Sequence, residues 1–270
     1  MIPKIIHYVW VGNTDPPNDV RSYVEGWKRL CPDYEIMEWN NDSLKEIHCD
    51  YVVQAFERQR WAFVSDYLRL YALKRHGGFY FDTDWEMTQS IDCFRDYAYV
   101  TSFECWNGVY SPINPAMIAA EPANPLISDL LQAYDEMSFL DEQGKEKLVT
   151  NTVLITRYLG QKYGLKEPWD STRVLEFVPR HVIFPASHFC APQKGKENWG
   201  IHHFNASWIN ALPPCRRRTI VSVGNLSLVR FIKNREPVDG DWIELADNEK
   251  MLLSLSLSVR RKYGILYTKA

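Results

Sequence analysis

A chain of 270 residues that is 46% hydrophobic and 14% aromatic can bury a sizeable core, so its composition indicates a soluble globular protein. The net charge is −3, and the charge of −8 on residues 1–215 argues against general nucleic-acid binding. No run approaches the roughly 18 apolar residues of a membrane span, and residues 1–6 lack the features of a signal peptide, which together predict a cytoplasmic protein.

The first predicted element is a strand over residues 2–11. This near-continuous apolar run ends at Gly12 and suits a strand that is covered on both faces of a parallel sheet. Ligands of open α/β sheets bind beyond the carboxyl ends of the strands. Trp10 and Val11 therefore lie where a ligand is expected, while His7 in mid-strand is interpreted as a core histidine.

A helix and a second strand complete a βαβ unit. Apolar residues recur at helical spacing from Val20 to Leu30, and residues 34–39 have the composition of a strand. Residues 40–43 offer turn and N-cap side chains, and they precede a more polar stretch, residues 44–59, that is predicted to be helical.

The most informative stretch is residues 61–86, with the sequence WAFVSDYLRLYALKRHGGFYFDTDWE. It predicts an amphipathic helix on which Asp66 and Arg69, three positions apart, point the same way. A Gly-Gly pair then ends the helix and residues 79–81 form an aromatic strand. Asp82 and Asp84 follow that strand, and two carboxylates one residue apart can converge on a hard cation such as Mg²⁺ or Mn²⁺.

The remaining pattern is that of an α/β protein. A helix is predicted to begin at Pro125 with Asn124 as its cap. Strands are predicted at residues 97–103, 117–120, 174–178 and 181–184.

The last part of the chain differs from the rest in charge. From Arg216 to Ala270 there are 11 Lys and Arg against six Asp and Glu, a net charge of +5, whereas residues 1–215 carry 20 against 28, a net charge of −8. We therefore predict a main domain at residues 1–214 and a basic C-terminal extension at residues 215–270, packed on the same domain. Basic clusters interleaved with apolar residues favour peripheral contact with an anionic membrane, and a C-terminal helix packed on the sheet is the alternative.

Three segments resemble the glycosyltransferases with a DXD motif. This family, glycosyltransferase family 32 and its relatives, includes capsular polysaccharide and O-antigen transferases, yeast-type initiating mannosyltransferases and the catalytic domains of clostridial glucosylating toxins. The strongest resemblance is Ser65-Asp66-x-x-Arg69 followed by Gly77-Gly78-x-Tyr80-x-Asp82-x-Asp84. Residues 2–10 resemble the family's opening segment, and residues 201–208 its closing motif. The resemblance covers roughly residues 2–210, although the family's Gly-Pro element is missing near residues 149–154.

The resemblance implies a GT-A-like nucleotide-sugar-binding fold, with a mixed, mainly parallel central sheet. It implies Mn²⁺ or Mg²⁺ as cofactor and a UDP-sugar as preferred donor, with GDP-mannose left open. The implied metal ligands are Asp82, Asp84 and His202. The implied catalytic residues are Asp66, Arg69, Asp82 and Asp84. The implied donor-binding residues are Val9, Trp10, Val11, Asp66, Arg69, Tyr80, Asp82, His202, Ser207 and Trp208.

The resemblance further implies that a sugar passes to a saccharide acceptor in surface polysaccharide biosynthesis, with the anomeric configuration retained. The acceptor is an oligosaccharide or a lipid-linked precursor. Two alternatives stay open. One is a metal-dependent phosphohydrolase with Asp82 as nucleophile and Asp84 as acid and base. The other is a toxin-like effector that glycosylates a protein.

Overall fold

The structure is a computed structural model, and it describes residues 1–106, 109–111, 113–165, 170–205, 216–223, 226–232, 250–255 and 266–268. The chain forms two compact units. The first consists of Met1–Cys105 and Tyr110–Asn205, and the second includes the strands that lie between Arg216 and Thr268.

The first unit is built on a seven-stranded sheet of order β2-β1-β3-β8-β5-β10-β9. These strands are β1 (Ile5–Val9), β2 (Glu35–Trp39), β3 (Gly78–Phe81), β5 (Tyr99–Ser102), β8 (Met117–Ala120), β9 (Leu175–Val178) and β10 (His181–Phe184). β1 is parallel to β2 and β3, and β10 is parallel to β5, while β8 is antiparallel to β3 and β5 and β9 is antiparallel to β10. Five strands therefore share one direction, which confirms the predicted mixed, mainly parallel sheet.

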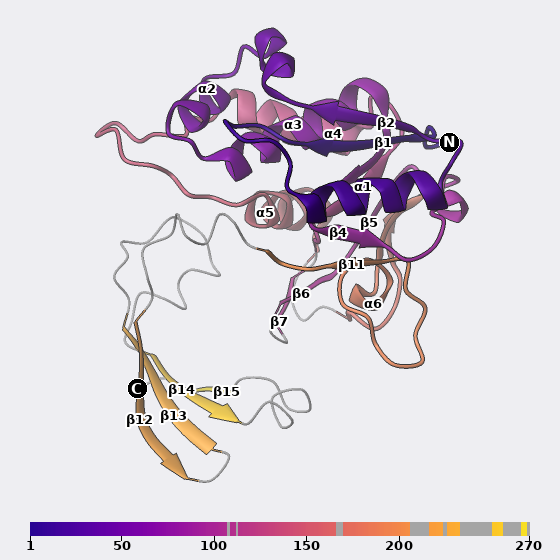
Figure 1. Ribbon diagram of the computed structural model, residues 1–270. Helices are drawn as coiled ribbons and strands as arrows, with labels where there is room; N and C mark the ends of the chain where they lie inside the picture. Colours follow the sequence, from indigo (N-terminus) through magenta and orange to yellow (C-terminus); the bar gives the residue numbers. More distant parts are fainter. Residues whose placement is uncertain are drawn as a thin grey trace. The chain divides into compact units, whose positions relative to one another are not determined.

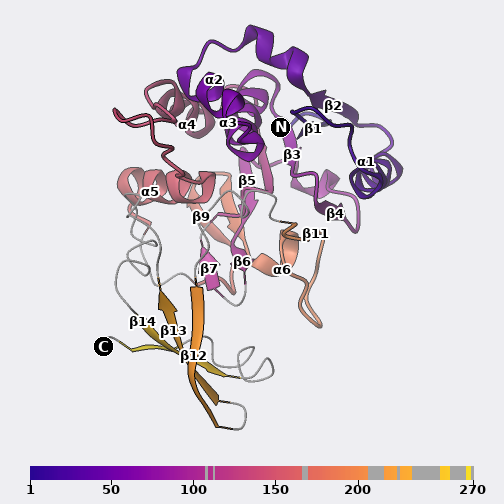
Figure 2. The same cartoon turned by 60° about the vertical axis from the view of Figure 1, so that its left-hand side comes forward.

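Helices pack on both faces of this sheet (Figure 1). They are α1 (Asn18–Leu30), α2 (Asp50–Glu57), α3 (Trp61–His76), α4 (Pro125–Asp135), α5 (Asn151–Tyr163) and α6 (Ala186–Phe189), with 3₁₀ turns η1 (Asn41–Glu46) and η2 (Asp92–Phe94). Figure 2 shows α2, α3 and α4 grouped together on one side of β1 and β3, with α1 apart from them.

The alternation of side chains along β3 explains why both faces are covered. Phe81 points to the face of α1, where its ring centroid lies 5.3 Å from that of Trp27. Tyr80 points to the opposite face, where the Arg69 guanidinium of α3 lies 4.7 Å from its ring centroid. Both faces must be apolar when both are buried, so the sequence of the strand reads as a continuous aromatic run.

Helix α3 ends where the Gly-Gly pair predicts. Gly77 has φ of 64° and its N–H donates to the Leu73 carbonyl. A Cβ atom at Gly77 would lie 2.6 Å from the Pro122 nitrogen, so both the backbone conformation and the space require glycine. The predicted cap of α4 is also confirmed, because the Asn124 side chain accepts a hydrogen bond from the Leu126 N–H at 3.0 Å.

The single helix predicted over residues 44–59 is wrong. The structure has η1, then an extended break, then α2. Asn40 caps η1 together with Ser43, as the turn residues predict. Ile47 and Cys49 are 6% and 3% exposed, and the extended backbone at both residues places their side chains in the core. The chain is extended here because this conformation buries both side chains, and a continuous helix is therefore not formed.

A short two-stranded sheet lies beside the main one. β4 (Trp85–Met87) is antiparallel to β11 (Gly200–His202), with Trp85 opposite His202. A Cβ atom at Gly200 would lie 1.9 Å from the ring of Trp85, which is fully buried and stacks on Phe81. Glycine at this position lets the two strands pair. β6 (Glu104–Trp106) and β7 (Val109–Ser111) form another two-stranded sheet.

The described part of the second unit is a four-stranded antiparallel sheet. Its strands are β12 (Arg216–Val223), β13 (Leu226–Ile232), β14 (Lys250–Leu255) and β15 (Leu266–Thr268). The alternative of a C-terminal helix is therefore wrong for these residues. The domain boundary between residues 214 and 215 stays a prediction, since it falls outside the described residues.

Candidate active site

The candidate site lies at the carboxyl ends of two adjacent parallel strands. Trp10 directly follows β1, and Asp82 directly follows β3. Because the two strands run in the same direction, their carboxyl ends lie at the same edge of the sheet. Each residue follows its strand as the sequence predicts, and the pairing of β1 with β3 brings the two strand ends together.

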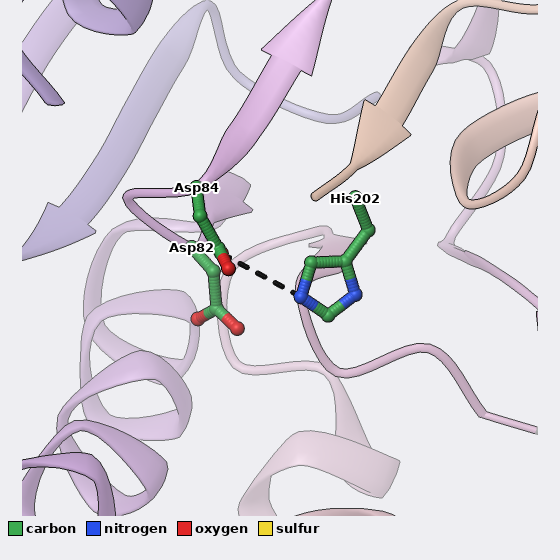
Figure 3. Close-up of side chains that lie close together, drawn as sticks. All are labelled: Asp82, Asp84 and His202. Carbon is green, nitrogen blue, oxygen red and sulfur yellow. Dashed lines mark ion pairs between the residues drawn. The ribbon is translucent and has the colours of Figure 1, made fainter. Parts of the chain in front are cut away.

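Asp82, Asp84 and His202 converge at this edge (Figure 3). Each side chain offers one ligand atom, and these atoms all lie within 4.8 Å of one another. The two aspartates come from the turn between β3 and β4, while the histidine comes from the end of β11. The pairing of β4 with β11 brings the histidine to carboxylates that are more than a hundred residues away in sequence.

Asp84 is held by two contacts from the His202 segment. Its Oδ1 lies 3.5 Å from His202 Nε2, and its Oδ2 accepts a hydrogen bond from the Asn205 N–H at 2.8 Å. Burial is the largest influence and raises the pKa of Asp84, but His202 and the backbone N–H groups of Asn205 and Asp84 together lower the net pKa. Burial lowers the pKa of His202, but Asp84, with smaller contributions from Asp82 and Glu104, raises the net pKa.

Asp82 is oriented by Tyr80 and Arg69. The Tyr80 hydroxyl donates to Asp82 Oδ1 at 2.7 Å, and Arg69 Nη2 lies 3.3 Å from the same oxygen. Tyr80 is 1% exposed, and burial raises its pKa well above the usual value. Tyr80 was predicted to bind the donor. In the structure its hydroxyl donates a hydrogen bond to Asp82, a candidate metal ligand.

Arg69 joins two acidic residues. Its Nη2 lies 3.0 Å from Asp66 Oδ1 as well as 3.3 Å from Asp82 Oδ1. Its Nη1 donates to the Pro115 carbonyl at 2.7 Å and its Nε donates to the Ser65 carbonyl at 3.3 Å. Burial lowers the pKa of Arg69, but Asp82 and Asp66 raise it to a net value above its usual range. The predicted Asp66–Arg69 pair is therefore a buried pair, with both side chains at 12% exposure or less.

Asn151 is a site residue that the sequence did not predict. It lies at the start of α5, where its N–H donates to Asp66 Oδ2 at 3.2 Å and its Nδ2 donates to the Asp66 carbonyl at 2.9 Å. Burial raises the pKa of Asp66 to about 6, and Arg69 and Asn151 limit this rise. Residues 149–152 showed only a small polar run, so a contact across 85 positions had no clear signal.

The residues around Trp10 divide into buried and accessible groups. Val9 and Val11 are 6% and 8% exposed and pack in the core, so only their backbone groups face the edge of the sheet. Trp10 is partly exposed, and its Nε1 donates to the Thr14 carbonyl at 2.7 Å. His7 is fully buried as predicted, with Nε2 2.7 Å from the Gly77 carbonyl and Nδ1 accepting from Trp39 Nε1.

Two of the predicted donor-binding residues, Ser207 and Trp208, lie outside the described residues. His203, next to the site, contacts other residues instead of the aspartates. Its Nε2 lies 2.8 Å from Glu86 Oε2, and its ring stacks on Tyr23 with centroids 5.4 Å apart. Of the two adjacent histidines, His202 is thus the one that faces the aspartates.

Residues 17–101, which include Asp66, Arg69, Asp82 and Asp84, match the family described as the glycosyltransferase sugar-binding region containing a DXD motif. Residues 17–101 of this chain are thus similar to the sugar-binding region of the DXD glycosyltransferases. This confirms the resemblance seen in the sequence, and Asp82-Thr83-Asp84, within the matched residues, has the DXD pattern.

Two curated relatives are also glycosyltransferases. The chain is 24% identical over 132 residues to an uncharacterized glycosyltransferase of Acanthamoeba polyphaga mimivirus, covering 47% of this chain and 53% of that protein. It is 31% identical over 104 residues to inositol phosphoceramide mannosyltransferase 3 of Schizosaccharomyces pombe, covering 36% and 28%. The chain thus spans about half of the first relative and less of the second. Among solved structures, it aligns with the PaToxG glycosyltransferase at a TM-score of 0.47 and 20% identity, covering 60% of this chain and 70% of that one.

Proposed function

We propose that this protein is a metal-dependent glycosyltransferase that transfers a sugar from a nucleotide-sugar donor to a saccharide acceptor. The observation that carries the proposal is the convergence of Asp82, Asp84 and His202 within a DXD glycosyltransferase region. The match to this region favours a transferase over the phosphohydrolase alternative.

A divalent cation fits the chemistry of these three side chains. Two carboxylates and one imidazole combine hard oxygen ligands with one nitrogen ligand, a set that favours Mn²⁺ and also admits Mg²⁺. When bound, such an ion stabilises the negative charge that accumulates on the diphosphate leaving group. We assign Asp82, Asp84 and His202 as its ligands.

Asp66 and Arg69 have separate roles in this proposal. Arg69 is 4% exposed and its guanidinium contacts both acidic residues, so it orients Asp82 toward the cation and Asp66 toward the donor. Asp66 is fixed by Asn151 and Arg69, and its carboxylate accepts hydrogen bonds from sugar hydroxyls. Arg69 and Asn151 both favour the ionised form of Asp66, which is the form that accepts hydrogen bonds through both oxygens.

The finer points of the donor and acceptor rest on the resemblance. We propose a UDP-sugar as donor, with the base on Trp10, and a retaining transfer of a hexose. We propose that the acceptor belongs to a surface polysaccharide such as capsule or O-antigen, as an oligosaccharide or a lipid-linked precursor. Transfer to a protein, as in a toxin-like effector, would use the same donor site. Only a test of saccharide and protein acceptors distinguishes it from transfer to a saccharide.

We further propose a cytoplasmic protein that contacts the inner face of the membrane through residues 216–270. The support is the charge of +5 in this segment beside −8 in the rest. In the described part of the chain, none of the helices has the length and apolar character needed to cross a bilayer. Vesicles with anionic lipid should sediment the wild type more than an Arg260/Arg261/Lys262 triple alanine variant, and a Lys194/Lys196 double alanine variant serves as control. Equal binding by all three contradicts this contact.

The activity is tested by incubating the full chain and Mn²⁺ with a panel of UDP- and GDP-sugars and measuring free nucleotide. We expect release with one donor, loss of release in EDTA, and a glycosylated product once a suitable saccharide is supplied. Release of phosphate from monoesters, with no turnover of any nucleotide sugar, would support the phosphohydrolase instead.

A further inference from the structure

Buried polar atoms without partners gather around Asp66. Among the described residues, six buried side-chain oxygen or nitrogen atoms have no hydrogen-bond partner in the protein. Three of them are Tyr51 Oη, Tyr134 Oη and Asn151 Oδ1, and the other three belong to Tyr99, Thr156 and His202. An unsatisfied polar group in the core is costly, so three in one region call for a physical explanation.

The packing places these three residues close to Asp66. Asn151 makes two hydrogen bonds to Asp66 through its backbone N–H and its Nδ2, which leaves only its Oδ1 unused. The ring of Tyr134 lies 4.9 Å from that of Tyr51 and 6.1 Å from that of Tyr67, the residue next to Asp66. The three residues thus come from α2, α4 and α5, with Asn151 in direct contact with Asp66 and the two tyrosine rings packed against each other and, through Tyr134, against Tyr67 of α3.

The electrostatics agree with this placement. After burial, which is the largest cause, the charge of Asp66 further raises the pKa of Tyr51 and of Tyr134. Burial alone raises the pKa of Tyr99, which lies on β5. Tyr99 is thus a buried phenol that also lacks a partner but stands apart from Asp66.

The three residues are too deeply buried to touch a substrate. Tyr51 is 0% exposed, Tyr134 1% and Asn151 1%, whereas the Asp66 side chain retains 12% exposure. Buried water molecules typically bind to about three otherwise unsatisfied polar groups. A hydroxyl such as a phenol can both donate to and accept from such a water, while an amide oxygen accepts.

We propose that Tyr51, Tyr134 and Asn151 are positioning residues for Asp66 and that they act through buried water molecules bound to their otherwise unpartnered polar atoms. The water molecules hold the side chain of Asp66 from its buried side, and the exposed part of its carboxylate faces the sugar of the donor. This inference rests on the proposed function for its effect on the donor. Its structural half, the hydrogen-bonded cluster, does not depend on that function.

The test compares Tyr51→Phe and Tyr134→Phe with Tyr99→Phe as the matched control. Each change removes one buried hydroxyl and keeps the ring. Loss of a hydroxyl that binds water should lower the melting temperature by about 2–4 °C, whereas loss of an isolated hydroxyl should leave it unchanged or raise it. We expect a decrease for Tyr51→Phe and Tyr134→Phe and none for Tyr99→Phe.

Calorimetric binding supplies the readout that a purely structural role would not change. Affinity for the nucleotide sugar that the wild type turns over should fall about three- to tenfold in Tyr51→Phe and Tyr134→Phe, while affinity for the free nucleoside diphosphate stays unchanged. Equal losses for both ligands, or stability equal to that of Tyr99→Phe, would overturn the positioning role. Wild-type protein that binds no nucleotide sugar would overturn the proposed function. The melting temperatures would still show whether the hydroxyls of Tyr51 and Tyr134 take part in a hydrogen-bonded cluster.

Discussion

The Arg69 guanidinium lies 3.3 Å from the Asp82 carboxylate, so the acidic residue of the DXD motif is coupled to helix α3. The same Nη2 atom lies 3.0 Å from Asp66. From the sequence alone, neutralising one of two neighbouring carboxylates is expected to relieve repulsion and to preserve or raise stability. The contact with Arg69 reverses this expectation for Asp82.

Asp82→Asn should therefore destabilise the protein by about 1–2 kcal/mol, because it removes a charged partner from a guanidinium that is 4% exposed. The free energy of unfolding in urea measures this change. Asp33→Asn is the control, since Asp33 pairs with Lys4 at the surface and such pairs contribute little. If Asp82→Asn is as stable as the wild type, the contact between Arg69 and Asp82 does not contribute to the stability of the fold.

Trp10→Ala should weaken binding of the nucleotide by about 1–3 kcal/mol, the range for a base that stacks on an aromatic ring. Trp10 is partly exposed at the end of β1, so its removal leaves the core largely intact. Trp10→Phe keeps an aromatic face and should retain most of the affinity. Equal affinity of Trp10→Ala and wild type, measured by calorimetry, would show that Trp10 contributes to packing and does not bind the base.

Stability should fall with decreasing pH because of His7. Burial lowers the pKa of His7 to about 4 from 6.5, so the unfolded chain takes up a proton before the folded protein does. Stability contributed by the neutral ring is complete above pH 6.5 and is lost between pH 6.5 and about 4. The loss amounts to about 3 kcal/mol, from 1.36 kcal/mol per pKa unit.

Urea unfolding at several pH values between 4.5 and 7.5 measures this dependence. His7→Gln is the control, because glutamine can donate to Gly77 and accept from Trp39 without titrating. The pH slope should be smaller in His7→Gln than in wild type. Parallel slopes would contradict the role of His7.

Gly200→Ala should destabilise the protein and weaken metal binding together. The added Cβ would lie 1.9 Å from the Trp85 ring, which is fully buried and donates from Nε1 to the Phe189 carbonyl. Overpacking of this kind costs about 1–3 kcal/mol, and the displaced β11 carries His202. Gly26→Ala in α1 is the matched control, since nothing lies within 4 Å of its added Cβ and alanine favours a helix. Equal stability in the two variants contradicts the close packing of Trp85 on β11.

Local patterns in the sequence predicted much of the site. Asp66 and Arg69 lie three positions apart on a helix, and Asp82 and Asp84 follow a strand, so their placement depends on neighbouring residues only. The positions of Asn151 and His202 depend on contacts over 85 and 118 positions, between α5 and α3 and between β11 and β4. Only the family resemblance pointed to His202, and no local pattern pointed to Asn151.

The fold shows the same division between local and distant causes. Strands β8 and β10 occupy the predicted residues, because each is a short buried run of apolar side chains. The order of the strands and the opposed direction of β8 depend on pairing between distant segments, which one sequence does not reveal. The break before α2 was missed since it depends on burial of Ile47 and Cys49, not on a proline or glycine.

The central claim is that Asp82, Asp84 and His202 hold a divalent cation that binds the donor diphosphate. Calorimetric titration of UDP and GDP into the full chain, with and without Mn²⁺, tests it most directly when repeated with Asp84→Asn and with Glu86→Gln as a neighbouring control. We predict that one nucleotide binds wild type and Glu86→Gln only in the presence of Mn²⁺, and that Asp84→Asn loses this binding. Equal binding by Asp84→Asn and wild type in Mn²⁺, or binding that ignores the metal, would contradict the account.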